Sequence, residues 1–261
     1  MKDGFVQTAS HGCIHYVEAG AGKPLVLLHS NGASALQYRF TMEAFAKSWR
    51  VIAMDMPGHG DSDPLTRHYS IEMYAESVVQ LLDCLKIDHA AVAGDSVGGS
   101  ICIALARDHA HRTQPVVISE CPLRNEKDWL STWPRIEASY SEPTQSMDEV
   151  KSRLRECTPE ILARWNIDRR KAGAWAMIDV MRAMREFDAI GALKQFKGPA
   201  TVIIGAKGNA LNNRAVYEEA VGKNNVAVLD GCGHFPMLDD PALFVKEVNR
   251  LVAGEIRRAH V

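Results

Sequence analysis

Hydrophobic residues recur along the chain in short runs of four or five, and longer mixed segments separate most of these runs. Near-continuous apolar runs of this length are typical of strands that are buried on both faces of a sheet. The first two runs lie close together, which predicts an antiparallel hairpin, whereas the later spacing predicts parallel βαβ units. The predicted strands are 5–8, 13–17, 24–28, 51–54, 90–93, 115–118, 200–204 and 226–229.

Two of the separating segments carry a helical pattern. Between residues 70 and 85, apolar residues stand at positions 71, 74, 78, 81, 82 and 85, which places them on one helix face, and Ser70 suits the N-cap. Residues 241–252 show a similar pattern and are expected to close the fold. The sequence therefore predicts an α/β protein with a mainly parallel sheet of about eight strands and flanking helices.

One segment breaks the alternation of strands and helices. About 80 residues between the strand ending near 118 and the strand starting at 200 show no strand pattern, which is too long for a plain loop. We expect a helical cap, residues 121–192, over the carboxyl edge of a core formed by 1–120 and 193–261. Its large apolar residues either pack the cap's own helices or face the cleft, and they are Trp129, Trp133, Trp165, Trp175, Met177, Met181 and Met184.

Composition narrows the partners and the compartment. The 261 residues are 24% charged with a net charge of −2, and no basic stripe suggests nucleic acid as a partner. We expect no membrane association, because no apolar run reaches about 20 residues and the first residues do not form a signal segment. The six cysteines form no C-x-x-C pair, which predicts free thiols in a reducing, cytoplasmic compartment. Composition leaves both a monomer and a homo-oligomer open.

The pentapeptide Gly-Asp-Ser-Val-Gly at 94–98 directly follows a predicted strand and precedes a run of small and apolar residues typical of a helix start. This is the G-x-S-x-G form of a nucleophile elbow, a tight strand-to-helix turn that exposes one serine hydroxyl. The two glycines remove a Cβ where backbone segments approach closely. We therefore expect Ser96 to be a nucleophile.

A serine hydroxyl needs a base, and the chain offers ten histidines. His234 stands in a glycine-rich turn, residues 231–236, directly after the last predicted strand, and so at the same sheet edge as Ser96. His29 follows the third strand and is expected to hold a loop, and His59 lies in a glycine-containing turn that suggests a structural role. His234 is therefore the predicted base.

With these residues in place, the chain resembles the α/β-hydrolase superfamily, in its capped form that includes esterases, enol-lactonases, carbon–carbon hydrolases and haloalkane dehalogenases. The resemblance rests on residues 28–32 (LHSNG), 55–62 (DMPGHGDS), the elbow and 231–234 (GCGH), in the family's order. Ser30 departs from the glycine that many members carry. The resemblance implies no metal or organic cofactor, a small-molecule substrate, and an oxyanion hole made by the backbone N–H groups of Val97 and Asn31.

The third member of the triad departs from the commonest pattern. Most relatives carry an aspartate three residues after the glycine that ends the penultimate strand, and here that position is Gly208, followed by Asn209. Glu120 stands two residues after the predicted strand at 115–118, and so at the same edge of the sheet as Ser96. Some families of the superfamily place their acid at this position. We therefore assign Glu120 to orient the base. The alternatives are a Ser96–His234 dyad or an acid supplied by Asp230.

Serine at the nucleophile position excludes the dehalogenase and epoxide-hydrolase chemistries of similar proteins, which use an aspartate there. We expect acyl transfer to water through an acyl-enzyme, from an ester, thioester, lactone or activated amide. Hydrolysis of a carbon–carbon bond beside a carbonyl is the alternative. Carbon–carbon hydrolases of the superfamily often carry an aromatic residue after the catalytic histidine, and Phe235 after the predicted base matches this pattern in part. A lyase, a cofactor-free oxygenase and a ligand receptor are less favoured readings on the same fold.

Three residues of the predicted cap are candidates for substrate binding. Arg124 lies four residues after Glu120, where it either pairs with a substrate carboxylate or is solvated. Trp129 and Trp133 are the aromatic candidates.

Overall fold

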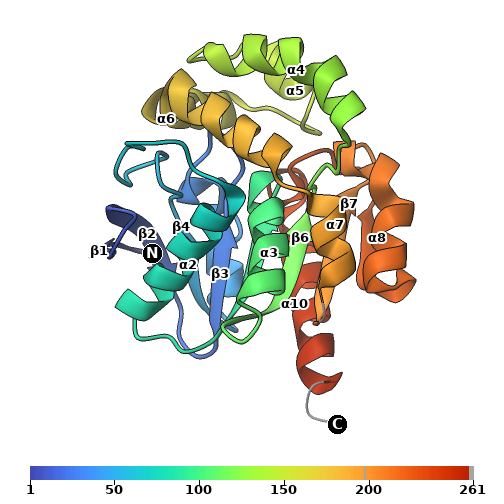
Figure 1. The fold of residues 1–261 in the computed structure, drawn as a ribbon. Coiled ribbons are helices and arrows are strands. Elements are labelled where there is room, and N and C mark those ends of the chain that lie inside the picture. The colour runs from blue at the N-terminus through green and yellow to red at the C-terminus, as the bar shows by residue number, and fades with distance from the viewer. Residues whose placement is uncertain (197, 259–261) are drawn as a thin grey trace.

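The computed structural model describes residues 1–196 and 198–258 and contains an eight-stranded sheet in the order β1-β2-β4-β3-β5-β6-β7-β8 (Figure 1). The β1–β2 and β2–β4 pairs are antiparallel and all the others are parallel, which confirms the predicted hairpin and the mainly parallel sheet. The strands are β1 (Lys2–Gln7), β2 (Cys13–Ala19), β3 (Pro24–Leu28), β4 (Arg50–Met54), β5 (Ala90–Asp95), β6 (Thr113–Ser119), β7 (Ala200–Gly205) and β8 (Val226–Leu229).

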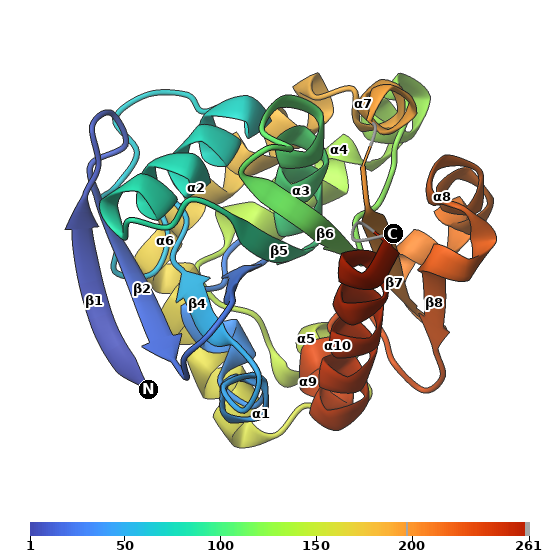
Figure 2. The same cartoon turned by 90° about the horizontal axis from the view of Figure 1, so that it is seen from below.

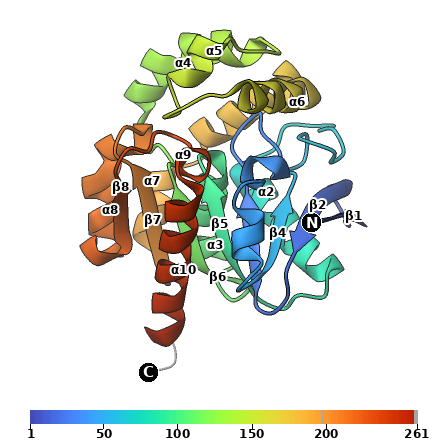
Figure 3. The same ribbon diagram turned by 180° about the vertical axis from the view of Figure 1, so that it is seen from behind.

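Helices cover both faces of the sheet, as the views from below and from behind show (Figures 2 and 3). On one face lie α2 (Ile71–Cys84), α3 (Val97–Asp108) and α7 (Ala189–Gln195), and on the other α1 (Met42–Phe45) and α10 (Pro241–Arg258). The helix α8 (Arg214–Val221) packs against β7 and β8. The short elements are the 3-10 helices η1 (Ala35–Tyr38), η2 (Asn209–Asn213) and η3 (Lys223–Asn225), and the helix α9 (Pro236–Asp239).

The strand β3 illustrates why the central strands read as continuous apolar runs. Leu25 and Leu27 belong to the cluster beneath α10, whereas Val26 and Leu28 belong to the cluster beneath α2 and α3. All four side chains are fully buried, because a helical layer lies on each face of the sheet. Full burial of one such side chain stabilises the fold by about 1.5–3 kcal/mol.

The helical patterns also correspond to helices. The side chain of Ser70 accepts a hydrogen bond from the backbone N–H of Met73 at 3.3 Å, which confirms it as the N-cap of α2. The final helix begins at residue 241 as expected and continues past 252 to residue 258.

Between β6 and β7 lies a helical insertion, defined here as α4 (Glu126–Ser141), α5 (Met147–Lys151), α6 (Pro159–Glu186) and their connections. It forms a separate layer above the end of the sheet that carries Ser96 (Figures 1 and 3). The helix α6 bends at Gly173, whose φ of 72° and ψ of 160° are not helical. The predicted boundary at 192/193 falls inside α7, which packs against α3 on the face of the sheet, so the division into core and cap stays a prediction.

Among the helices that the structure describes, none combines the length and the apolar character needed to cross a membrane.

Candidate active site

Ser96 occupies a tight turn between β5 and α3. Its φ of 55° and ψ of −111° lie in a sparsely populated region for a residue with a side chain, and its N–H donates to the carbonyl of Ser119 at 2.9 Å. A Cβ on Gly94 would lie 2.1 Å from the carbonyl oxygen of Gly98, and a Cβ on Gly98 would lie 2.4 Å from that of Leu28. The turn is strained and close-packed, as a nucleophile elbow requires.

Glu120 lies at the first position after β6, with a φ of 44°, and its side chain is completely buried. One carboxylate oxygen, Oε1, accepts a hydrogen bond from the N–H of Gly205 at 2.6 Å, and Oε2 accepts one from Ala210 at 3.3 Å. Oε2 also lies 3.1 Å from Nδ1 of His234. The structure therefore brings Glu120 and His234 together, through groups at the ends of three neighbouring strands.

Gly208 explains how a carboxylate from β6 fits beside this histidine. A Cβ at position 208 would lie 2.1 Å from Oε1 of Glu120 and 2.3 Å from its carboxyl carbon. The φ of Gly208 is −84°, so the backbone itself does not require glycine here. The side chain is absent for steric reasons, because the Glu120 carboxylate occupies the space that a residue at 208 would fill.

The loop that carries His234 is bonded to the helical insertion. The N–H of His234 donates to the carbonyl of Arg153 at 3.0 Å, just beyond α5. The preceding Gly233 donates its N–H to Asp239 at 2.6 Å, and the same carboxylate accepts the N–H of Arg155 at 2.6 Å. Asp239 therefore supports the loop and does not contact the imidazole.

A cavity of about 450 Å³ lies between this edge of the sheet and the insertion, and both Ser96 and His234 line it. A space of this size accommodates a small to medium organic molecule. The other lining residues are Pro122, Arg124, Arg135, Ile136, Ser139, Tyr140, Gln145, Glu149, Ser152, Arg153, Met181, Met184 and Asn209.

The two N–H groups predicted to form the oxyanion hole are Val97 at the start of α3 and Asn31 after β3. Neither N–H donates to an acceptor within the part of the chain that the structure describes. The side chain of Asn31 is engaged elsewhere: Nδ2 donates to the carbonyl of Met177 in α6 at 2.8 Å, and Oδ1 lies 3.3 Å from Nε2 of His59.

His29 and His59 hold loops, as expected from their positions. Nδ1 of His29 donates to the carbonyl of Ser30 at 2.7 Å, and its Nε2 accepts the N–H of Met56 at 3.0 Å. Burial lowers the pKa of His29, and burial together with the neighbouring His29 lowers the pKa of His59 to about 3. Both rings are therefore neutral at physiological pH, and His29 has both ring nitrogens committed.

A buried polar network lies beneath the nucleophile, and the sequence did not reveal it. The hydroxyl of Ser30 donates to Oε1 of Gln37 at 2.9 Å, and Nε2 of Gln37 donates to Asp95 at 3.1 Å. Ser119 donates its hydroxyl to the other oxygen of Asp95 at 3.0 Å. Burial raises the pKa of Asp95, and the charge of Glu120 raises it further. The network also gives Ser30 a hydrogen-bonding role.

Of the three candidates for substrate binding, the structure brings Arg124 to the cavity. Its guanidinium lies over the ring of Trp129, 4.8 Å from the ring centre, and Trp129 is buried and does not line the cavity. Trp133 is also absent from the lining, and the guanidinium of Arg185 lies over its ring, 5.4 Å from the ring centre.

Sequence reasoning missed the face of α4 that lines the cavity. Arg135, Ile136, Ser139 and Tyr140 lie at helical spacing on that face. Their three- and four-residue separations were available as a signal, but the charged and polar members masked the face as solvent-exposed. Asn209, which the sequence analysis named only as the neighbour of Gly208, also lines the cavity.

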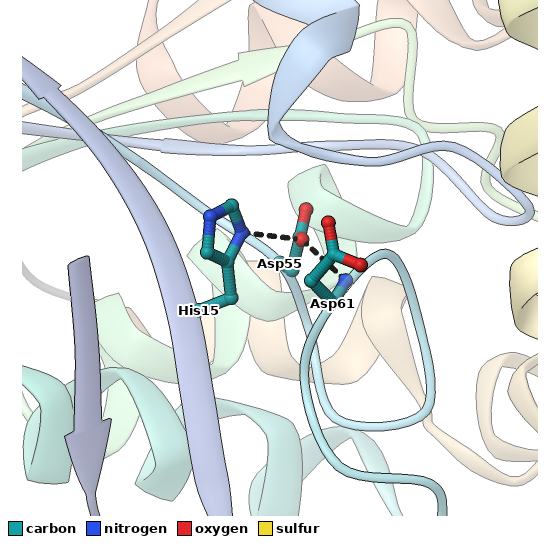
Figure 4. A group of neighbouring side chains, drawn as sticks. All are labelled: His15, Asp55 and Asp61. Carbon is teal, nitrogen blue, oxygen red and sulfur yellow. Dashed lines mark hydrogen bonds and ion pairs between the residues drawn. The ribbon is translucent and has the colours of Figure 1, made fainter. Parts of the chain in front are cut away.

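Within the described part of the chain, a group of three potential metal ligands consists of His15 on β2, Asp55 after β4 and Asp61 (Figure 4). Their ligand atoms lie within 4.8 Å of one another, and none of the three residues lines the cavity. Nδ1 of His15 lies 2.7 Å from Oδ2 of Asp55, which also accepts the N–H of Asp61 at 2.8 Å. Oδ1 of Asp55 accepts the N–H of Ala35 at 2.6 Å, and Asp61 pairs with Lys171 at 2.6 Å. These bonds occupy the ligand atoms, so we interpret the cluster as structural.

Comparisons with known proteins identify the family of the chain. Residues 23–164 match the sequence model of the alpha/beta hydrolase fold family. A 2-hydroxymuconate semialdehyde hydrolase of Pseudomonas sp. (strain CF600) is 38% identical over 105 residues, 39% of this chain and 37% of the relative. An (E)-2-((N-methylformamido)methylene)succinate hydrolase of Acinetobacter baylyi is 33% identical over 96 residues, 37% of this chain and 36% of the relative. The chain thus matches little more than a third of the length of these curated relatives.

A similarity in structure extends over nearly the whole chain. The enol-lactonase from Burkholderia xenovorans LB400 superposes with a TM-score of 0.83 at 24% identity, covering 96% of this chain and 100% of that protein. At this level of identity the likeness establishes the fold alone.

Gly208→Ala is expected to lower kcat at least tenfold and to destabilise the protein by about 1–3 kcal/mol, because the new Cβ overlaps the Glu120 carboxylate and displaces it from His234. Gly198→Ala is a matched control, since the atoms nearest to its Cβ would be those at the flexible end of the Gln114 side chain. Steady-state ester hydrolysis and thermal unfolding measure both effects. An unchanged kcat in Gly208→Ala would show that the carboxylate is not held as described.

The His15–Asp55 pair predicts a pH-dependent contribution to stability. The hydrogen bond to Asp55 raises the pKa of His15, so its extra stabilisation is complete below the unfolded-state value of about 6.5 and is lost as pH rises through the folded-state pKa. The difference in unfolding free energy between the wild type and His15→Gln should therefore shrink between pH 6 and pH 9. Urea titrations across this range measure it, and a constant difference would contradict the charged pair.

Proposed function

Because the chain belongs to the alpha/beta hydrolase fold family, we propose that it is a serine hydrolase, which transfers an acyl group from its substrate to Ser96 and then to water. The observation that carries this proposal is the cavity that Ser96 and His234 share, with the buried Glu120 carboxylate behind the imidazole. Nucleophilic acyl transfer needs a nucleophile, a base and a group that orients the base, and we assign these roles to Ser96, His234 and Glu120.

The proton transfers follow from the contact between Glu120 and Nδ1 of His234 at 3.1 Å. A carboxylate beside Nδ1 favours the tautomer that carries its proton there, which leaves Nε2 free to accept the proton of the Ser96 hydroxyl. The imidazolium formed during attack is stabilised by the same carboxylate, and it then protonates the leaving group. In the second half of the reaction His234 activates water in the same way to hydrolyse the acyl-enzyme.

The negative charge that develops on the substrate's carbonyl oxygen requires donors that are already in position. We assign this role to the N–H groups of Val97 and Asn31, which have no competing acceptor within the described part of the chain. Val97 is also the first residue of α3, so the helix dipole adds to the stabilisation of the oxyanion.

The size of the cavity, about 450 Å³, favours an ester, lactone or related acyl compound of small to medium size. We further propose that residues 121–192 act as a cap over this cavity and that the protein works without a cofactor. All six cysteines are free, which supports a cytoplasmic location.

A second candidate function is hydrolysis of a carbon–carbon bond beside a carbonyl. It is favoured by the 38% identity over 105 residues to a 2-hydroxymuconate semialdehyde hydrolase. The ring of Phe235 also packs edge-on against His234, with 4.8 Å between the ring centres. Turnover of a vinylogous 1,5-diketone acid but not of short esters would select this reaction over ester hydrolysis.

Glu120→Gln is expected to lower kcat by two or more orders of magnitude, because the amide no longer holds the required tautomer or stabilises the imidazolium. Asp230→Asn is the matched control, since Asp230 is exposed and makes no contact with His234 among the described residues. Hydrolysis of 4-nitrophenyl acetate and butyrate measures both variants.

Equally small effects of the two substitutions would show that Glu120 is not the triad acid. Labelling by a fluorophosphonate, lost in Ser96→Ala, identifies the nucleophile in the same preparations. Labelling without turnover on a broad ester panel would contradict a hydrolase and favour a receptor, a lyase or an oxygenase.

A further inference from the structure

The lining of the cavity that contains Ser96 holds more cationic than anionic residues. Guanidinium groups of Arg124, Arg135 and Arg153 line it, against a single carboxylate, that of Glu149. Within the described part of the chain, none of the three arginines lies within 4 Å of a carboxylate oxygen. The cavity therefore has guanidinium groups whose charge the protein itself does not pair.

Other arginines of the helical insertion do have acidic partners. Arg164 pairs with Asp168 at 2.7 Å, and Arg185 pairs with Glu126 at 2.5 Å. Arg169, which is buried, has no carboxylate within 4 Å in the described part of the chain, but its guanidinium donates to the carbonyls of Ser139 and Glu142.

The one acidic residue of the lining does not neutralise the arginines. Oε2 of Glu149 accepts both the N–H and the hydroxyl of Ser146 at 2.7 Å, as part of the capping box at the start of α5. Its charge is stabilised first by these hydrogen bonds and then by the neighbouring charges of Arg153 and Arg169. The three arginines of the lining nevertheless outnumber the one carboxylate.

Arg124 is the most constrained of the three. It is half-buried, and its guanidinium stacks over the ring of Trp129, which restricts its orientation. Burial lowers the pKa of Arg124, which is the physical sign of a cation with incomplete solvation. A planar guanidinium held in one orientation matches a carboxylate, which accepts two parallel hydrogen bonds from it.

Arg153 lies at the part of the cavity next to the predicted base, because its carbonyl accepts the N–H of His234 at 3.0 Å. Its guanidinium donates to the hydroxyl of Ser139 at 3.3 Å, a neutral partner, and its charge acts on Glu149 without forming an ion pair within 4 Å in the described part of the chain. Arg135 is exposed on α4 and contributes to the attraction of anions toward the opening.

We propose that the substrate is an acyl compound that also carries a carboxylate, such as the half-ester of a dicarboxylic acid, and that Arg124 binds this carboxylate while Arg153 and Arg135 add to the attraction. The reaction assigned to this compound rests on the proposed function, whereas its binding does not. Binding and turnover are therefore tested separately.

Binding is measured by titration calorimetry on Ser96→Ala with succinate, glutarate and adipate, and with hexanamide as a neutral ligand. At least one dicarboxylate should bind with one-to-one stoichiometry and hexanamide should not. Adding Arg124→Gln should weaken binding at least tenfold, and Arg124→Lys should fall between the two, because it retains the charge and loses the planar fork. Arg182→Gln is the matched control on α6, since Arg182 does not line this cavity, and it should leave binding unchanged.

Turnover is measured on the wild type with two esters of similar size, mono-4-nitrophenyl adipate and 4-nitrophenyl hexanoate, after subtraction of the uncatalysed rates. The ratio of kcat/KM values, acidic to neutral, should exceed ten and should fall at least tenfold in Arg124→Gln. Arg182→Gln should preserve the ratio. Thermal unfolding and fluorophosphonate labelling show whether the Arg124 variants keep a folded site, and Arg124→Lys serves if Arg124→Gln does not fold.

The outcomes separate the two proposals. Equal turnover of both esters without dicarboxylate binding would overturn the carboxylate site and leave the serine hydrolase intact. Dicarboxylate binding that depends on Arg124, without turnover of either ester, would overturn the proposed reaction and support the site. Tighter binding of inorganic phosphate than of every dicarboxylate would overturn the assignment of a carboxylate.

Discussion

The Glu120 carboxylate is the contact on which the arrangement of the candidate site depends. It joins the end of β6 to the N–H of Gly205 at the end of β7, to Ala210 in the following turn and to His234 after β8. A fully buried carboxylate without such donors would destabilise the protein by several kcal/mol, so the turn after β7 has to present its N–H groups to it. Gly208 is the matching requirement, because any side chain there would overlap the carboxylate.

A second buried carboxylate lies nearby, and the two are not equivalent. Asp95 is held by Gln37 and Ser119, at 3.1 and 3.0 Å, and burial together with the charge of Glu120 raises its pKa. The hydrogen bonds that Asp95 accepts from Gln37 and Ser119 act in the opposite direction and favour its ionised form. Of the two carboxylates, Glu120 is the one that contacts His234, at 3.1 Å.

Local patterns made the strands and the nucleophile turn predictable from the sequence. The apolar run of β3 reflects its own burial on both faces, and the glycines of the elbow reflect contacts within a few residues and with the adjacent strand. The position of Glu120 was also predictable, because the end of a parallel strand defines the sheet edge at which its side chain lies.

The insertion was predictable as helical but not in its contacts. Trp129 and Trp133 lie four residues apart on α4, yet neither lines the cavity, because Arg124 covers one and Arg185 the other. Which side chains of α4 line the cavity depends on how α4 packs against α6, and short-range sequence patterns do not encode this packing. The packing of α7 against α3 is another long-range contact of this kind, and the predicted boundary at 192/193 falls within that helix.

The same insertion is bonded to both loops on which the proposed chemistry relies. The carbonyl of Arg153 accepts the N–H of His234, and the carbonyl of Met177 accepts the side chain of Asn31. A Cβ on Gly233 would lie 2.5 Å from the same Arg153 oxygen, so the approach of the two segments is close as well as bonded. Arg153 therefore lines the cavity with its side chain and positions the base with its backbone. Because one residue does both, the shape of the binding cavity and the placement of His234 are not independent, and a change in the insertion acts on specificity and on catalysis together.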